Sequence, residues 1–391
     1  MNHHKSICIL SDDYPSPNRP VYVFVEQLVY ALLDLETDIY IVAPQSLIRS
    51  FFRRLPLLPQ KQKYRSPHGQ EYWVYRPYSF SFGKGHTSLY RIFKGYNNKV
   101  LESVLDKIKP DILYGHFWHN ANKMKDYARK QNLPLFVACG EGDNAMEELV
   151  AHLSYEEKRQ LTESVSGVIC VSTENKRRCI SLGLAYENNL VVLPNATDTT
   201  KFHPLERNIE LRCSMGVEND DFLILFVGSF SPRKGCNYLA EAINKINDPK
   251  IKVIFVGESF KGYDYDPVCQ GIVYKGKVAH EKLPLFYASA DVFVLPTQKE
   301  GCCNAIVEAL ACGLPVISSN RPFNDDILNN CNSIKINPTD NHDILTAILK
   351  MKNDKKFYQQ LKRNVVSSAA NYSIIERARL ILAFINKQIQ S

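Results

Sequence analysis

The sequence lacks any uninterrupted apolar run of the roughly 18–20 residues that a membrane-spanning helix requires. Its first apolar stretch, Ile7 to Leu10, is too short for the core of a secretory signal and runs directly into an acidic Ser-Asp-Asp sequence. We therefore expect no transmembrane helix and no leader. The expected location is cytoplasmic, either soluble or peripheral at the inner face of a membrane.

Paired cysteine spacings are missing as well. The eleven cysteines contain no C-x-x-C pair, and their number is odd. This pattern argues against both a disulfide framework and a zinc site, so reduced thiols in a cytosolic compartment are the simpler expectation. No G-x-G-x-x-G follows the first apolar stretch either, which counts against a dinucleotide-dependent oxidoreductase.

The length and charge of the chain limit its organisation and its partners. A chain of 391 residues predicts two domains, and 45% apolar with 23% charged residues is typical of globular proteins. The net charge of +7 is uneven, because positions 47–130 hold 17 Lys and Arg against 5 Asp and Glu. Within this region, positions 47–65 interleave apolar side chains with six basic and no acidic residues, which suits an anionic membrane surface. A solvated basic loop is the alternative. Nucleic acid is not expected as a partner, because no helix-turn-helix or zinc pattern accompanies the charge.

Short apolar runs alternate with helical patterns along both halves of the chain, which predicts an α/β fold. The clearest unit is the segment 291–319. Val292 to Leu295 form a continuous apolar run typical of a buried strand, and Asn304 to Cys312 are good helix formers. Gly313 and the proline two residues later end that helix, and a second strand begins at Val316.

Two carboxylates are fixed by this strand–helix–strand unit. Glu300 falls in the loop at the carboxyl end of the first strand, and Glu308 falls inside the helix. Ligands of open α/β sheets bind at that edge, and the helix start near Cys303 and Asn304 offers free N–H groups to an anion. Ionised carboxylates accept paired hydrogen bonds from vicinal hydroxyls, which suits a hydroxyl-rich ligand. A plain surface position is the alternative for each glutamate.

The run EGCCNAIVEALACGLPVI from Glu300, with its Glu-x7-Glu spacing, resembles the signature of retaining glycosyltransferases of the GT-B fold, particularly glycosyltransferase family 4. The resemblance implies two Rossmann-like β/α/β domains that face each other across a cleft. Residues 1–198 would form the acceptor-side domain, and residues 199–372 the nucleotide-sugar domain. A helix at about 373–391 would pack back on the first domain. Glu300 would contact the donor sugar and Glu308 the ribose, with three neighbouring residues also at the donor: Cys302, Cys303 and Asn304.

The segment GSFSPRKG, after an apolar run at 222–227, resembles the family's VG-x-x-x-x-x-KG element. Backbone N–H groups around Gly228 and the cations of Arg233 and Lys234 would then neutralise the donor diphosphate. Adjacent basic residues in a loop are otherwise usually just solvated. Ser229 stands where relatives often carry a basic residue. Three further residues fall where relatives hold the nucleobase through their backbone: Gly276, Lys277 and Val278.

The first half resembles the family less closely. His116, in PDILYGHFWH, matches the second histidine of a family run near the acceptor, although an aromatic-packed structural histidine is the alternative. Cys139 stands where many relatives place another histidine, and Glu141 becomes a rival candidate for contacting the acceptor. Tyr22 is a third acceptor candidate, and it ends a loop from Asn18 that lacks the Gly-Gly pair of many relatives.

The resemblance implies a retaining, metal-independent glycosyltransferase that moves a hexose from a UDP- or GDP-sugar to a glycan or lipid-linked acceptor in cell-surface polysaccharide biosynthesis. Catalysis would fall to Glu300, Lys234, Arg233 and His116. No cofactor is implied, and the D-x-D sequence at 264–266 is interpreted as incidental. The alternatives are an epimerase or phosphorylase with the same two-lobed shape, and a non-catalytic, membrane-associated binding module.

Overall fold

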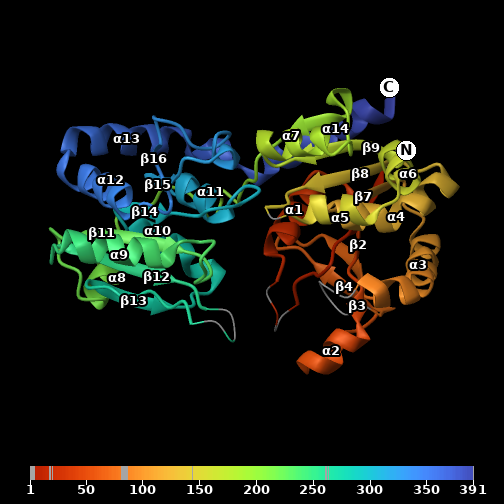
Figure 1. Ribbon diagram of the computed structural model, residues 1–391, viewed down its shortest axis with the longest axis horizontal. Helices are drawn as coiled ribbons and strands as arrows, with labels where there is room; N and C mark the ends of the chain where they lie inside the picture. Colours follow the sequence, from red (N-terminus) through yellow and green to blue (C-terminus); the bar gives the residue numbers. More distant parts are fainter. Residues whose placement is uncertain are drawn as a thin grey trace. The chain divides into compact units, whose positions relative to one another are not determined.

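The computed structural model describes residues 5–16, 19, 21–80, 87–142, 144–259, 262 and 264–390, and the side chains at 87–91 are not described (Figure 1). Asn18, part of the glycine-free loop discussed above, lies outside the described residues. The chain divides into two compact units. The first contains residues 1–171, 175–193 and 375–391, and the second contains residues 172–174 and 194–374.

The first unit is built on an eight-stranded sheet with the order β10-β9-β8-β7-β1-β2-β5-β4. All neighbours are parallel except the β4–β5 pair. Its strands are β1 (Ser6–Leu10), β2 (Asp38–Val42), β4 (Lys61–Arg65), β5 (Glu71–Tyr75), β7 (Ile112–His116), β8 (Leu135–Cys139), β9 (Val165–Cys170) and β10 (Leu190–Val192), and a separate parallel pair is formed by β3 (Gln45–Ser46) and β6 (Tyr78–Ser79). The central strands are buried on both faces, which explains their continuous apolar sequences.

Helices connect these strands and cover the sheet. They are α1 (Val23–Asp34), α2 (Leu47–Arg53), α3 (Thr87–Ile108), α4 (Trp118–Gln131), α5 (Ala145–His152), α6 (Tyr155–Ser164), α7 (Thr173–Ser181), the 3₁₀ turn η1 (Glu187–Asn189) and the final helix α14 (Ile374–Gln390). The Phe384 ring on α14 packs edge-on against Phe136 of β8 at 6.2 Å, and Gln388 donates to the Asn188 carbonyl at 3.1 Å. The end of the chain therefore completes the core of the first unit.

The second unit holds a fully parallel six-stranded sheet with the order β13-β12-β11-β14-β15-β16. Its strands are β11 (Phe222–Val227), β12 (Ile251–Val256), β13 (Ile272–Gly276), β14 (Val292–Leu295), β15 (Val316–Ser319) and β16 (Ser333–Ile336). Its helices are α8 (Ile209–Ser214), α9 (Cys236–Ile246), α10 (Leu283–Ser289), α11 (Asn304–Ala311), α12 (Asn341–Asn353) and α13 (Lys355–Ser368), with 3₁₀ turns η2 (His280–Lys282), η3 (Pro322–Asn324) and η4 (Ala369–Tyr372). The predicted α/β class is confirmed in both units.

Each sheet reverses its strand order beside its first strand. β1 lies between β2 and β7, and β11 lies between β12 and β14. The loops that leave two such neighbouring strands diverge to opposite faces and open a crevice at the carboxyl edge, where ligands of open α/β sheets bind. In the second unit these are the loops after β11 and β14, which contain the predicted donor residues.

The basic segment 47–65 is not one continuous loop. Its first part is the helix α2, and its last part is the strand β4, which pairs antiparallel with β5. The Lys61 ammonium lies 4.2 Å from the centre of the Trp73 ring, and Lys63 forms an ion pair with Glu71. The cations of β4 therefore contact side chains of the neighbouring strand β5. The pairing of these two strands could not be inferred from local composition. No helix in the described part of the chain has both the length and the apolar character needed to cross a membrane.

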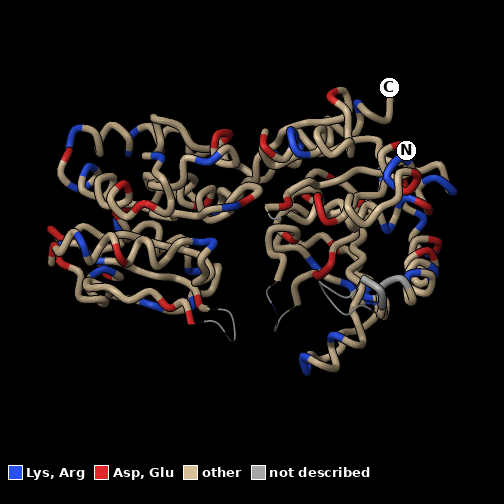
Figure 2. Tube along the Cα trace, in the orientation of Figure 1, with Lys and Arg blue, Asp and Glu red and all other residues tan. Residues whose placement is uncertain are grey.

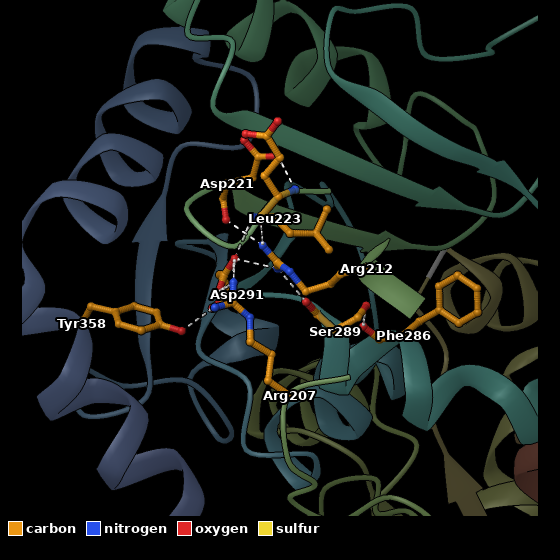
Figure 3. Close-up of polar contacts among 9 residues, drawn as sticks. Arg207, Arg212, Asp221, Leu223, Phe286, Ser289, Asp291 and Tyr358 are labelled. Carbon is orange, nitrogen blue, oxygen red and sulfur yellow. Dashed lines mark hydrogen bonds and ion pairs between the residues drawn. The ribbon is translucent and has the colours of Figure 1, made fainter. Parts of the chain in front are cut away.

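A buried ionic network fixes the start of β14 (Figure 3). Asp291 Oδ2 accepts hydrogen bonds from the Leu223 backbone N–H at 2.7 Å and from Arg212 Nη1 at 3.2 Å. Arg207 Nη2 binds Asp291 Oδ1 at 3.0 Å, and the Tyr358 hydroxyl donates to the Asp291 carbonyl at 3.0 Å. This network ties α8 and α13 to the amino ends of β11 and β14, and so holds the two strands that carry the site.

Candidate functional site

Two loops from neighbouring strands are joined by backbone contacts to form the candidate site. The Arg233 carbonyl accepts from the Gln298 backbone N–H at 2.7 Å, and Thr297 Oγ1 lies 3.2 Å from the same carbonyl oxygen. Gly235 caps α9 with φ of 74°, and a Cβ atom there would lie 2.2 Å from the Pro296 carbonyl oxygen. Only glycine permits both this backbone conformation and this close approach. The loop after β11 is therefore fixed against the loop after β14.

This arrangement brings Arg233, Lys234 and Glu300 into one ion cluster. Arg233 Nη1 and Lys234 Nζ each lie 2.7 Å from Glu300 Oε1, and Thr297 Oγ1 donates to the same oxygen at 2.7 Å. The side chains of Lys234 and Glu300 are only 13% and 11% exposed, whereas that of Arg233 is 46% exposed. The cluster combines two cations with one anion, so it retains a net positive charge at the carboxyl edge of the sheet.

The electrostatics of the cluster favour the ionised forms of Glu300 and Lys234. Burial alone would raise the pKa of Glu300, but the charges of Lys234 and Arg233 outweigh it and hold that pKa below its ordinary value. Burial likewise opposes the charge on Lys234, yet the neighbouring Cys303 and Glu300 raise the pKa of its ammonium. An ionised, partly desolvated cation pair is the kind of group that stabilises an anionic ligand.

Glu308, on α11, belongs to a second cluster. Its Oε1 lies 3.0 Å from His280 Nε2, and its Oε2 accepts from the Tyr287 hydroxyl at 3.0 Å. Glu308 is buried, and each of its carboxylate oxygens has one of these protein partners. Burial acts against the imidazolium, but the hydrogen bond and the charge of Glu308 raise the pKa of His280 above its ordinary value. Each carboxylate oxygen keeps further lone pairs that a ribose hydroxyl could use.

The first turn of α11 lies between these two clusters. Asn195 Nδ2 donates to the Cys302 carbonyl at 3.0 Å and to Asn304 Oδ1 at 2.8 Å. The Cys303 thiol, buried at the N-cap, lies 3.6 Å from Lys234 Nζ. Of these three residues, Cys303 contacts the ion cluster directly, and Cys302 and Asn304 are joined by Asn195.

Gly228 lies beside the ion cluster, since a Cβ atom there would be 3.5 Å from Lys234 Cδ. The Gly228 N–H donates to the Val256 carbonyl at 2.9 Å, and the Ser229 hydroxyl lies 3.3 Å from that of Ser231. Gly276 ends β13, and the Lys277 side chain is 70% exposed and pairs with Glu258 at 2.5 Å. Val278 is half-buried, and the segment then continues into His280, which contacts Glu308.

In the first unit, the three acceptor candidates are brought to one edge of the sheet. His116 ends β7 and packs against the rings of Phe117 and Phe24 at 4.6 and 5.4 Å. The Phe24 ring in turn lies 5.5 Å from Tyr22. Burial lowers the pKa of His116 to about 3, so this imidazole is neutral at pH 7, and no described residue is a hydrogen-bond partner of its Nδ1. Burial also raises the pKa of the Tyr22 hydroxyl to about 12.

Glu141 is placed beneath the start of α4. Its Oε1 accepts from the Trp118 backbone N–H at 2.8 Å, while Oε2 has no hydrogen-bond partner among the described residues. Burial raises the pKa of Glu141 well above the ordinary value. Cys139, predicted to stand where many relatives carry another histidine, is fully buried, so it is not placed to contact an acceptor.

Several site residues were not identified from the sequence. His280 and Tyr287 come from η2 and α10, and their contact with Glu308 depends on tertiary packing. In the first unit, Asp12 lies two residues after the end of β1 and binds His119 Nε2 at 2.5 Å and Lys123 Nζ at 3.3 Å. The position of Asp12 after a predicted strand was the available signal, since that edge is where parallel sheets bind ligands.

The raised pKa of His280 predicts a pH-dependent contribution to stability. Because its folded pKa exceeds the unfolded value, the stabilisation is fully present below about pH 6.5 and is lost as pH rises through the folded pKa. We expect His280→Gln to lower the melting temperature more at pH 6 than at pH 9. The control is His203→Gln, at an exposed position, which should show no such difference. Equal losses at both pH values for His280→Gln would contradict the prediction.

Comparison with known proteins gives a family match over part of the chain. Residues 209–367 match the family model described as glycosyl transferases group 1. TuaC of Bacillus subtilis (strain 168), named for a glycosyltransferase role in teichuronic acid biosynthesis, is 26% identical over 326 residues, 78% of each chain. The Escherichia coli UDP-Gal:alpha-D-GlcNAc-diphosphoundecaprenol alpha-1,3-galactosyltransferase is 29% identical over 199 residues, 48% of this chain and 51% of that one.

Structural comparison extends over the whole chain. Sucrose-phosphate synthase from Thermosynechococcus elongatus has a TM-score of 0.77, and the match covers 99% of both chains at 16% identity. An identity this low supports the fold alone, which is a two-domain α/β architecture with parallel sheets. Residues 209–367 are therefore similar to group 1 glycosyltransferases, and the whole chain shares the two-domain α/β fold of the solved structure.

Proposed function

We propose that this protein is a retaining glycosyltransferase of family 4 that transfers a hexose from a UDP- or GDP-sugar to a glycan or lipid-linked acceptor in cell-surface polysaccharide biosynthesis. The observation that carries the proposal is the cluster of Arg233, Lys234 and Glu300 at the strand-order reversal of the second unit. A diphosphate needs cations of this kind, and a sugar needs a fixed carboxylate beside them. The names of the two relatives above, which refer to cell-surface glycans, support the choice of substrate class.

In the proposed reaction, the bond between the sugar C1 and the diphosphate oxygen breaks, and its electron pair goes to the diphosphate. Arg233 and Lys234 stabilise that developing charge, while Glu300 orients the sugar. A hydroxyl of the acceptor attacks C1 on the face that the leaving group vacates, and its proton passes to the departing phosphate oxygen. Configuration at C1 is therefore retained without a covalent carboxylate intermediate.

The other predicted residues have proposed roles around this reaction. Glu308 accepts from the ribose hydroxyls, and the backbone at 276–278 contacts the nucleobase. His116, Glu141 and Tyr22 position the acceptor, and the neutral state of His116 suits hydrogen bonding to a hydroxyl. Because two side-chain cations serve the diphosphate, we propose that no metal ion is required, and turnover should persist in excess EDTA.

The function is tested by incubating the purified protein with a panel of nucleotide sugars. One UDP- or GDP-sugar should raise the melting temperature, because a ligand that binds only the folded state stabilises it by mass action. The same donor, with cell-surface glycan or lipid-linked acceptors, should release the nucleoside diphosphate. Interconversion of the donor without acceptor would instead indicate an epimerase, and a requirement for inorganic phosphate would indicate a phosphorylase.

We also propose that the protein acts at the cytoplasmic face of a membrane and that α2 contacts the lipid. The part of the basic segment that remains available is this helix, with no buried residue and with Phe51 and Phe52 79% and 77% exposed. Figure 2 shows Lys and Arg but no Asp or Glu along this helix. Arg49 and Arg53 are exposed on the same helix, and Arg54 follows it. Paired aromatic rings beside basic groups favour an anionic interface, where each cation contributes on the order of 1 kcal/mol.

Replacing both Phe51 and Phe52 by Ser should therefore reduce co-sedimentation with phosphatidylglycerol vesicles, while binding to phosphatidylcholine stays weak for every variant. The matched control is Tyr155→Ser, because Tyr155 is 82% exposed on a different helix of the same unit. Equal losses in the two variants, or an absence of vesicle binding by the unmodified protein, would argue against a lipid-binding role for α2.

A further inference from the structure

Four sulfur atoms converge inside the first unit, next to the loop after β8 that carries Glu141. Cys139 and Cys170 are paired neighbours at the carboxyl ends of β8 and β9, and Cys179 comes from α7. The three thiol sulfurs lie within 4.8 Å of one another, and the Cys139 and Cys179 sulfurs are 3.4 Å apart. The Met146 thioether sulfur, from α5, lies 3.5 Å from Cys139 Sγ and 3.7 Å from Cys179 Sγ.

This set, called here the sulfur cluster, has the dimensions of a metal site. Three sulfurs bound to one ion at about 2.3 Å would be separated by about 4.0 Å, which falls within the observed spacing. All four residues are fully buried, so no solvent competes for an ion at the centre. A site made only of thiols and a thioether suits a soft cation, and such ligands select Cu(I), zinc or iron–sulfur clusters. Zinc sites are built from Cys, His and carboxylates, so the thioether of Met146 favours Cu(I).

Two hydrogen-bond donors favour charge on two of the sulfurs. Trp118 Nε1–H donates to Cys179 Sγ at 3.3 Å, and Asn175 Nδ2 donates to Cys139 Sγ at 3.5 Å. Buried N–H groups directed at sulfur stabilise a thiolate, in the manner of the second ligand sphere of known metal sites. The donors therefore face the two cysteines that an ion would require in deprotonated form.

We propose that the sulfur cluster binds one Cu(I) ion. Binding releases one proton each from Cys139 and Cys179, whose thiolates form the two charged bonds to copper. Cys170 and Met146 supply neutral sulfur contacts, so the copper and its ligands carry one net negative charge. The ion would join β8, β9, α5 and α7. Asn175, which also donates to the Glu141 carbonyl at 3.0 Å, connects the cluster with the loop after β8.

The test uses Trp118 as a local reporter. The chain has two tryptophans, so Trp73→Phe leaves Trp118 as the sole indole, and replacing the exposed Cys213 and Cys331 by Ser removes surface thiols. Cu(I) is supplied anaerobically from a bicinchoninate complex, both to the folded protein and during refolding from urea. We expect Trp118 emission to fall and saturate at one equivalent, with a higher melting temperature for the loaded protein.

Substitutions of the cluster residues then test whether the ion binds at the sulfur cluster. Cys139→Ser and Cys179→Ser should abolish the change in emission, whereas Cys312→Ser, a buried thiol in the second unit, should leave it intact. Met146→Leu keeps all three thiols and should weaken Cu(I) binding without abolishing it. This variant still tests the proposal if a thiol variant fails to fold. X-ray absorption of the loaded protein should show sulfur neighbours only. The proposal is overturned if neither loading route gives binding, or if Cys139→Ser and Met146→Leu both bind copper as the parent does.

Discussion

Replacing Glu300 by Gln should lower the turnover number by about two to three orders of magnitude while the protein stays folded. The carboxylate is the shared partner of Arg233 and Lys234, which both contact Oε1 at 2.7 Å. An amide has nearly the same shape but no charge, so it can no longer hold both cations in place or accept strong hydrogen bonds from the sugar. The loss should therefore fall mainly on turnover, because these contacts matter most as charge develops on the leaving diphosphate.

The experiment compares Glu300→Gln with Glu258→Gln at saturating concentrations of the donor found in the nucleotide-sugar screen. Glu258 lies in the same unit, but it is 61% exposed and pairs only with the exposed Lys277 among the contacts observed. Its variant should keep near-normal turnover, since an exposed ion pair contributes about 1 kcal/mol or less. Thermal melting of both variants checks that the fold is intact. Near-normal turnover of Glu300→Gln would remove this carboxylate from the reaction.

Much of the second unit could be predicted because its signals are local. The strands β11 and β14 are continuous apolar runs, and α11 ends where Gly313 takes φ of 70°. The end of a helix depends on backbone conformation, which a single residue largely determines. The sequence also placed the loops of Arg233, Lys234 and Glu300 at the carboxyl ends of strands in a parallel sheet. The structure shows that these two strands are neighbours, which brings the three side chains together.

What could not be predicted depends on packing between distant segments. The partners of Glu308 come from η2 and α10, and nothing in the sequence around His280 or Tyr287 marks them as ligands of a carboxylate. The strand β4 was hidden in the basic segment because its pairing with β5 uses Lys61 over Trp73, a tertiary contact. The burial of Cys139 is of the same kind, because it depends on α5 and α7 closing over the ends of β8 and β9.

The second large effect is expected on stability. Replacing Arg212 by Met should lower the free energy of unfolding of the second unit by about 3–5 kcal/mol. Arg212 is 2% exposed, and its guanidinium binds Asp291 together with three backbone carbonyls, those of Ser289, Glu218 and Asp221. Met fills similar volume but leaves these acceptors without their donor, and an uncompensated buried charge is costly.

Arg207→Met is the matched control, because Arg207 binds the same carboxylate at 3.0 Å from a position 44% exposed. Water can replace that contact, so the expected loss is about 1 kcal/mol or less. Both tryptophans belong to the first unit, so fluorescence would not report on this unit, and differential scanning calorimetry is the appropriate measurement. A two-domain chain need not unfold in one step, and the Arg212 effect should appear in the transition of the second unit alone. Similar losses for the two variants would mean that burial does not decide the strength of this network, and that the start of β14 is held by its backbone contacts instead.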